Sequence, residues 1–153
     1  MTGLDRTDPV IVGHLLAQHR ELFARLLAAR AAFTAADGGG PEGLRGIMDC
    51  LRELREHLAC HFGQEESGGF LEESIARVPR LAAATGRVLA EHPALLAELD
   101  RLIETLATAD ISRLSWHQAA RDFETFVEHL QAHERNENAV VQEGYNEDLG
   151  FGD

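Results

Sequence analysis

Basic residues are scarce in this chain of 153 residues, in which 14 Lys and Arg stand against 26 Asp and Glu. The formal net charge is -12 at pH 7. Phosphate backbones and anionic membrane surfaces repel such a chain. We therefore expect no nucleic acid and no membrane among its partners.

Long apolar runs are also missing, since none approaches the roughly 20 residues that span a bilayer. The first ten residues, MTGLDRTDPV, lack the basic and apolar regions of a signal peptide. These absences predict a cytoplasmic protein. The only two cysteines, Cys50 and Cys60, lie on one expected helix at a spacing of about 15 Å, too far for a disulfide. We expect both to be reduced thiols.

Strand-like alternation of apolar and polar residues is absent, whereas apolar residues recur at helical spacing in four long segments. Asp8 and Pro9 suit the start of the first helix, and Ser115 with Gln118 suits the start of the fourth. Gly144 is expected to end the fourth helix. The expected long helices are 8–36, 41–67, 79–109 and 115–144, with a short crossing helix between the second and the third.

Two of these helices carry the same polar stripe. His57, His61 and Glu65 follow one another at four-residue intervals, and His129, His133 and Glu137 repeat both the residue types and the spacing. Residues four apart share a helix face. In the other two helices, His19 and His92 interrupt the apolar faces.

The chain also repeats itself at a longer period. LAQHRELFARL around His19 resembles LAEHPALLAEL around His92, 73 residues later, and the two polar stripes are offset by 72. A helix pair used twice closes most simply as an antiparallel up-down four-helix bundle with approximate two-fold symmetry. The sequence therefore predicts a single all-α domain over 1–153, with halves 8–67 and 79–144 and a tail 145–153.

Burying so many ionisable side chains is costly unless they are paired or bind a metal. Antiparallel helices bring the two stripes level, so the pattern predicts two adjacent pockets and a dinuclear metal site. Imidazole with carboxylate suits iron, zinc, manganese or copper, whereas calcium and magnesium prefer oxygen ligands. The eight candidate metal ligands are His19, His57, His61, Glu65, His92, His129, His133 and Glu137.

These motifs resemble the hemerythrin-like (HHE cation-binding) proteins. HFGQEE at 61–66, EHPALLAEL at 91–99 and the isolated His19 are similar to the second-helix, third-helix and first-helix motifs of that family. The resemblance implies a four-helix bundle that holds two iron ions with an oxo or hydroxo bridge, with zinc or manganese as alternative metals. It also implies a small ligand such as dioxygen, hydrogen peroxide or nitric oxide.

The fourth helix leaves two carboxylates open. His133 with Glu137 fits the four-residue spacing of many bacterial members, and His129 with Glu134 fits the five-residue spacing of the oxygen carriers. The internal repeat favours Glu137. The third helix departs from the carriers, because Val88 stands where they have a second histidine. Otherwise we expect Glu134, like Glu66, to face solvent.

Three functions remain open at this point. The first is a di-iron protein that binds or reduces oxygen species, with slow consumption of peroxide or nitric oxide as its possible enzymatic activity. The second is a metal-responsive or oxygen-responsive sensor, and the third is a metal store or structural metal bundle. If all eight candidates bind and an oxo or hydroxo bridge takes one position on each ion, two six-coordinate ions are saturated, which argues against reversible storage of dioxygen. The sequence does not indicate an oligomeric state.

Overall fold

The computed structural model describes residues 9–36, 40–67, 70–110 and 114–146, and within these ranges it describes side chains except at 9–18, 70, 73, 145 and 146. The described residues form helices and no strand. The helices are α2 (Pro9–Ala36), α3 (Gly40–Ser67), α4 (Phe70–Arg77), the 3-10 turn η1 (Pro79–Leu81), α5 (Ala82–Thr108) and α6 (Trp116–Asn146).

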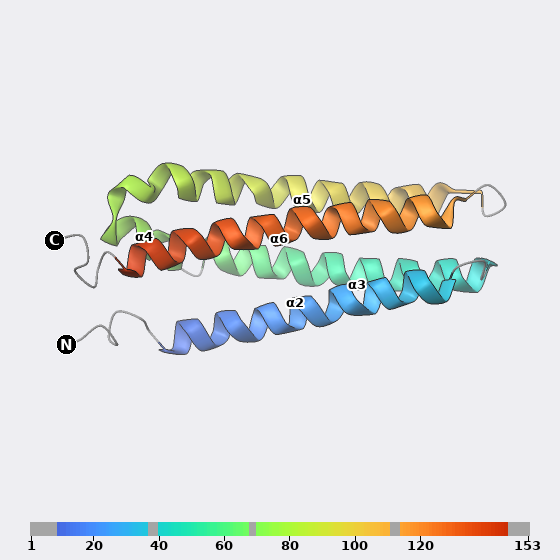
Figure 1. Ribbon diagram of the computed structural model, residues 1–153, viewed down its shortest axis with the longest axis horizontal. Coiled ribbons are helices and arrows are strands. Elements are labelled where there is room, and N and C mark those ends of the chain that lie inside the picture. Colours follow the sequence, from blue (N-terminus) through green and yellow to red (C-terminus); the bar gives the residue numbers. More distant parts are fainter. Residues whose placement is uncertain (1–8, 37–39, 68–69, 111–113, 147–153) are drawn as a thin grey trace.

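The four long helices lie side by side as an antiparallel bundle (Figure 1). α2 packs on α3, α5 packs on α6, and α3 also contacts α5. The short helix α4 lies across the end of the bundle where α3 ends, and it contacts α6. This arrangement confirms the predicted all-α bundle with a crossing helix between its second and third long helices.

Local sequence accounts for where two of the helices begin. The backbone N–H of Gln118 donates to Ser115 Oγ at 3.1 Å, so Ser115 caps α6 as predicted. The Gln118 side chain donates to Asp122 at 2.7 Å and accepts from Arg121 at 2.8 Å, and neither contact is the return half of a capping box. α3 begins at Gly40 with a φ of 66°, a left-handed conformation that glycine adopts without steric cost.

The prediction that Gly144 ends α6 is wrong, because the helix continues to Asn146. Gly144 is buried, and a Cβ atom added there would lie 2.8 Å from Cβ of Ser74 in α4. Such a contact is shorter than packed side chains tolerate. The glycine therefore allows α4 to approach α6 closely, and that requirement comes from tertiary packing.

Buried side chains form two apolar clusters that differ in size. The larger cluster includes Leu51, Leu54, Leu58, Leu95, Leu99, Phe126 and Leu130. The smaller cluster is Leu71, Val88 and Val140. Along α5, His92 stands between Val88 and Leu95, so a buried polar layer separates the two clusters. Each ionisable group in that layer needs a compensating partner.

Candidate metal centre

Six of the eight predicted ligands converge in the buried polar layer. They form two groups, and within each group the potential ligand atoms all lie within 4.8 Å of one another. The first pocket consists of His19, His61, Glu65 and Glu137, and the second pocket consists of Glu65, His92, His133 and Glu137. The two carboxylates are therefore common to both pockets.

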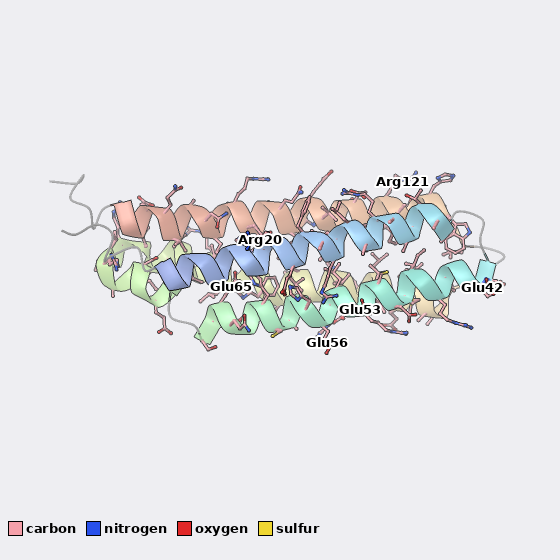
Figure 2. The ribbon with its side chains drawn as sticks, turned by 90° about the horizontal axis from the view of Figure 1, so that it is seen from below. Arg20, Glu42, Glu53, Glu56, Glu65 and Arg121 are labelled. Atoms are coloured by element: carbon pink, nitrogen blue, oxygen red, sulfur yellow. The ribbon has the colours of Figure 1, made fainter. Side chains whose placement is uncertain are left out.

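Helix geometry explains how these side chains meet. His61 and Glu65 stand one turn apart on α3, as His133 and Glu137 do on α6. Because α3 and α6 run in opposite directions, the two pairs approach each other in the interior. Figure 2 shows Glu65 between the helices, whereas the exposed Glu56 of the same helix points away from the bundle.

Glu65 divides its two oxygen atoms between the pockets. Its Oε2 lies 2.9 Å from Nε2 of His61, and its Oε1 lies 3.0 Å from Nε2 of His92. Glu137 contributes a looser contact, with Oε2 3.6 Å from Nε2 of His133. A carboxylate that faces an imidazole on each side is suited to bridging two cations.

Carboxylates from neighbouring helices orient the two imidazoles of the second pocket. Nδ1 of His92 lies 2.8 Å from Glu66 Oε2, and Nδ1 of His133 lies 2.8 Å from Glu91 Oε1. In the tautomer that donates from Nδ1, the lone pair of each ring is on Nε2. Phe62 stacks on His92 with ring centroids 3.9 Å apart and planes 7° apart, which fixes that ring further.

The pockets contain polar atoms that satisfy one another poorly. Nε2 of His92 and of His133 and both oxygen atoms of Glu65 and Glu137 are buried without a hydrogen bond. Although His92 and Glu65 approach to 3.0 Å, this contact lacks the angles of a hydrogen bond. Buried polar atoms in this state are rare in folded proteins. Their lone pairs converge on shared space, and a cation there would satisfy them, so these residues fit a bound metal.

The electrostatics of the shared carboxylates point the same way. Burial acts to raise the pKa of Glu65, but its contacts with His61, His92 and Glu137 outweigh burial and lower that pKa. Burial raises the pKa of Glu137, and the neighbouring Glu65 carboxylate adds to the increase despite the opposing contact with His133. Two carboxylates this close do not both ionise readily without a cation. A metal ion would remove that conflict.

The first pocket is less enclosed, and a further carboxylate lies beside it. Nε2 of His19 lies 3.2 Å from Oε2 of Glu134, and the two side chains are 22% and 23% exposed. Both atoms are buried and without a hydrogen bond. Burial, followed by the charge of His61, lowers the pKa of His19, and burial raises the pKa of Glu134. Glu134 therefore does not simply face solvent, as the sequence had suggested.

The structure does not bring His57 and His129 into either pocket. Residues four apart are offset by roughly 40° around a helix, so the three members of each stripe cannot all face one point. Nδ1 of His57 lies 4.0 Å from Oε2 of Glu21. His129 is 58% exposed, and its Nδ1 lies 2.9 Å from Oε1 of Glu98. At this level of the bundle the interior is filled by leucines such as Leu58 and Leu130.

The structure also places the two candidate carboxylates of the fourth helix and Val88 of the third. Of the two fourth-helix carboxylates, Glu137 belongs to both pockets, whereas Glu134 contacts His19 and is not grouped with His129. Val88, where the oxygen carriers have a histidine, is buried in the smaller apolar cluster. The second pocket is therefore built with two imidazoles.

Sequence reasoning missed the carboxylates that orient the imidazoles. Glu66 was expected to face solvent, and its side chain is 52% exposed. It nevertheless extends from α3 to contact His92 of α5. Glu91 was not considered as a site residue. Both residues directly adjoin a predicted ligand, Glu65 or His92, and this adjacency was the available signal. A neighbouring position is turned by about 100° on the helix and faces the adjacent helix.

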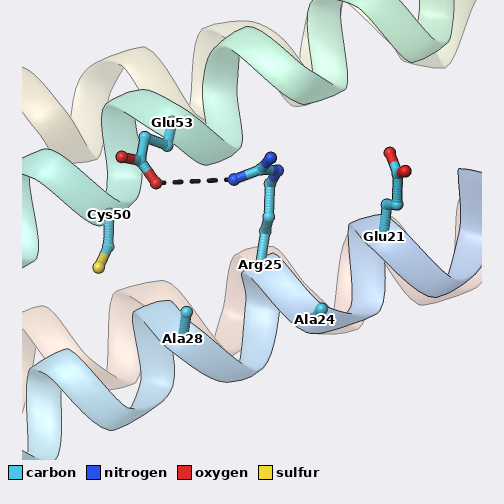
Figure 3. A pocket seen from close by; sticks show the side chains of 6 residues that line it. All are labelled: Glu21, Ala24, Arg25, Ala28, Cys50 and Glu53. Carbon is cyan, nitrogen blue, oxygen red and sulfur yellow. Dashed lines mark ion pairs between the residues drawn. The ribbon is translucent and has the colours of Figure 1, made fainter.

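A separate groove lies between α2 and α3, away from the polar layer (Figure 3). Its volume is about 360 Å³, and Arg25 approaches Glu53 at 3.6 Å across it. Burial raises the pKa of the Cys50 thiol, so the thiolate that a reactive cysteine needs is disfavoured. Cys50 and Cys60 are both free cysteines. The groove contains none of the pocket residues.

The fold and the buried histidine and glutamate cluster define a cation-binding helical bundle. The chain belongs to the family described as the hemerythrin HHE cation binding domain, whose sequence model matches residues 10–143. This match confirms the resemblance noted in the sequence. No curated protein and no solved structure matches the chain. Among the described residues, no helix is both long enough and apolar enough to cross a membrane.

Proposed function

We propose that the two pockets hold two iron ions and that this centre reacts with, or senses, dioxygen, peroxide or nitric oxide. The observation that carries the proposal is the position of Glu65. Its two oxygens approach imidazoles of different pockets, at 2.9 Å from His61 and 3.0 Å from His92. This placement supports two cations that share carboxylates.

The donor set favours a transition metal over calcium or magnesium. Each pocket offers two imidazoles and two carboxylates, and this mixture suits iron, manganese or zinc. Iron is the metal that the family resemblance favours. When bound, it would supply redox chemistry that no side chain of the cluster provides.

The chain's own residues would hold and shield the ions. Glu66 and Glu91 fix the rings of His92 and His133, so that Nε2 of each faces the pocket in the Nδ1–H tautomer. Phe62 covers one face of His92 and limits access of water to the second pocket. The four residues of a pocket fill four of about six positions around an octahedral ion, which leaves room for a small ligand.

Metal analysis of protein purified from cells grown with iron tests the proposal, together with ultraviolet-visible spectra before and after peroxide and nitric oxide. We expect two iron ions per chain and a spectral change with at least one reagent. His61→Ala should lower the metal content, whereas His117→Ala is the matched control because His117 is exposed and outside both pockets.

Each alternative has its own outcome in this experiment. Two ions that stabilise the fold but react with none of these reagents would indicate a metal store or structural bundle. Zinc as the only bound metal, or a single ion per chain, would contradict the proposed di-iron centre. A sensor would bind or react with the reagent and change its conformation without consuming it catalytically.

A further inference from the structure

Glu134 contacts an imidazole on a different nitrogen from the carboxylates that orient the second pocket. Glu66 and Glu91 approach Nδ1 of His92 and His133, on the far side of each ring from the buried Nε2. Glu134 approaches Nε2 of His19, at 3.2 Å. That nitrogen is buried and has no hydrogen bond, so it is the atom that a cation in the first pocket would use.

A carboxylate has different consequences at the two ring positions. At Nδ1 it accepts the ring proton and leaves the lone pair of Nε2 available for metal. At Nε2 it lies next to the position that a cation bound to that nitrogen would take, so it can act as a ligand itself. The Glu134 oxygen nearest His19 is itself buried without a hydrogen bond, as the oxygens of Glu65 and Glu137 are.

We propose that Glu134 is a third carboxylate ligand, bound to the cation of the first pocket alone. The inference rests on the proposed two-metal centre and adds to it an inequality between the two ions. The first pocket would have two imidazoles and three carboxylates, and the second would have two imidazoles and two carboxylates. A shell richer in oxygen favours harder cations, so the first pocket would select manganese or iron more strongly over softer metals.

The two pockets also differ in how deeply their side chains are buried. His92 and His133 are almost fully buried, whereas His19 and Glu134 retain 22% and 23% exposure. The first pocket therefore lies closer to solvent, and Glu134 stands at its exposed side. A small ligand that enters from solvent would meet the first ion beside Glu134.

Stepwise titration of the metal-free chain with cobalt(II), followed by its visible absorption, tests the proposal. We expect the parent to bind two ions and Glu134→Gln to weaken one of the two steps by about tenfold or more, the range known for residues that support metal sites. Glu128→Gln is the matched control, because Glu128 is an exposed carboxylate of the same helix outside both pockets. It should leave both steps unchanged.

Two backgrounds identify the pocket that is affected. His92→Ala removes a ligand of the second pocket alone, and His19→Ala removes a ligand of the first alone. Adding Glu134→Gln should weaken binding of the remaining cobalt ion in the His92→Ala chain and leave that binding unchanged in the His19→Ala chain.

The outcomes that overturn the inference differ from those that overturn the two-metal centre. If the parent binds two ions and Glu134→Gln leaves both steps unchanged, or weakens both equally, Glu134 is not a ligand of the first ion and the two-metal centre stands. If the parent binds fewer than two ions, the two-metal centre fails, and the inference fails with it. Circular dichroism of each metal-free variant establishes that it is folded before titration.

Discussion

The contact between Glu91 and His133 offers a sharp test of how the second pocket is built, because the chain contains a matched pair. Glu91 Oε1 lies 2.8 Å from Nδ1 of His133, and Glu98 Oε1 lies 2.9 Å from Nδ1 of His129. Both pairs join α5 to α6 through the same groups. Only the first pair involves an imidazole of a metal pocket.

The expected magnitudes follow from this difference. Removing a carboxylate that orients a metal-binding histidine typically costs about 10–100-fold in metal affinity, or about 1.4–2.8 kcal/mol. Glu91→Ala should approach the upper value. Glu91→Gln should cost less, since its amide oxygen can still accept from Nδ1 of His133, although Asn136 Nδ2 also donates to Glu91 at 3.3 Å. Glu98→Ala and Glu98→Gln should leave metal affinity unchanged.

Competition with a chelator of known affinity, monitored with cobalt(II) or zinc, measures these differences directly. Melting temperatures of the metal-free variants provide a control for stability, because an exposed imidazole–carboxylate pair such as Glu98 with His129 contributes only about 0–1 kcal/mol. Equal losses in metal affinity for the Glu91 and Glu98 variants would refute the argument. That result would mean that the Nδ1 contacts stabilise the bundle and do not tune the metal site.

Three further predictions concern the metal, the outer histidines and the packing of α4. The metal-free protein should melt about 11–22 °C below protein whose two sites are each occupied at 100 times their dissociation constant, and equal melting temperatures after complete chelation would contradict a role of metal in organising the core. The His57→Ala and His129→Ala variants should each retain two metal ions by elemental analysis. Loss of an ion from either variant would show that the substituted histidine is a metal ligand. Gly144→Ala should destabilise the protein by about 1–3 kcal/mol in denaturant titrations, because its Cβ would lie 2.8 Å from that of Ser74. The control Gly86→Ala, with open space around its Cβ, should not destabilise it.

The fold follows closely from local sequence features. Apolar periodicity and the turn residues place all four long helices, and the repeat around His19 and His92 indicates their pairing. The predicted end of α6 was wrong because a glycine such as Gly144 can have either of two structural roles. A glycine can end a helix, or it can allow another helix to approach, and only the contact with Ser74 decides between them.

Spacing indicated the site less completely than the fold. It led to four of the six residues that the structure brings together, because four-residue spacing places pairs such as His61 and Glu65 on one face. The other two, His19 and His92, were indicated by their places on apolar helix faces. Extending the same rule over three residues also included His57 and His129, although the offset of roughly 40° per step accumulates. The contacts of Glu66, Glu91 and Glu134 join different helices, so spacing within one helix does not predict them.

The position of the outer histidines changes the chemistry that the site supports. With eight ligands and an oxo or hydroxo bridge, two six-coordinate ions would be saturated, and a ligand would enter only after an imidazole dissociated. With His57 and His129 outside the pockets, each pocket supplies four donors and the same bridge supplies a fifth, which leaves one of about six positions open. If Glu134 takes that position at the first ion, the first ion is full but lies beside the more exposed side of its pocket, while the second ion is enclosed by buried side chains. A small molecule would then bind at the first ion by displacing the bridge, with no loss of a protein ligand.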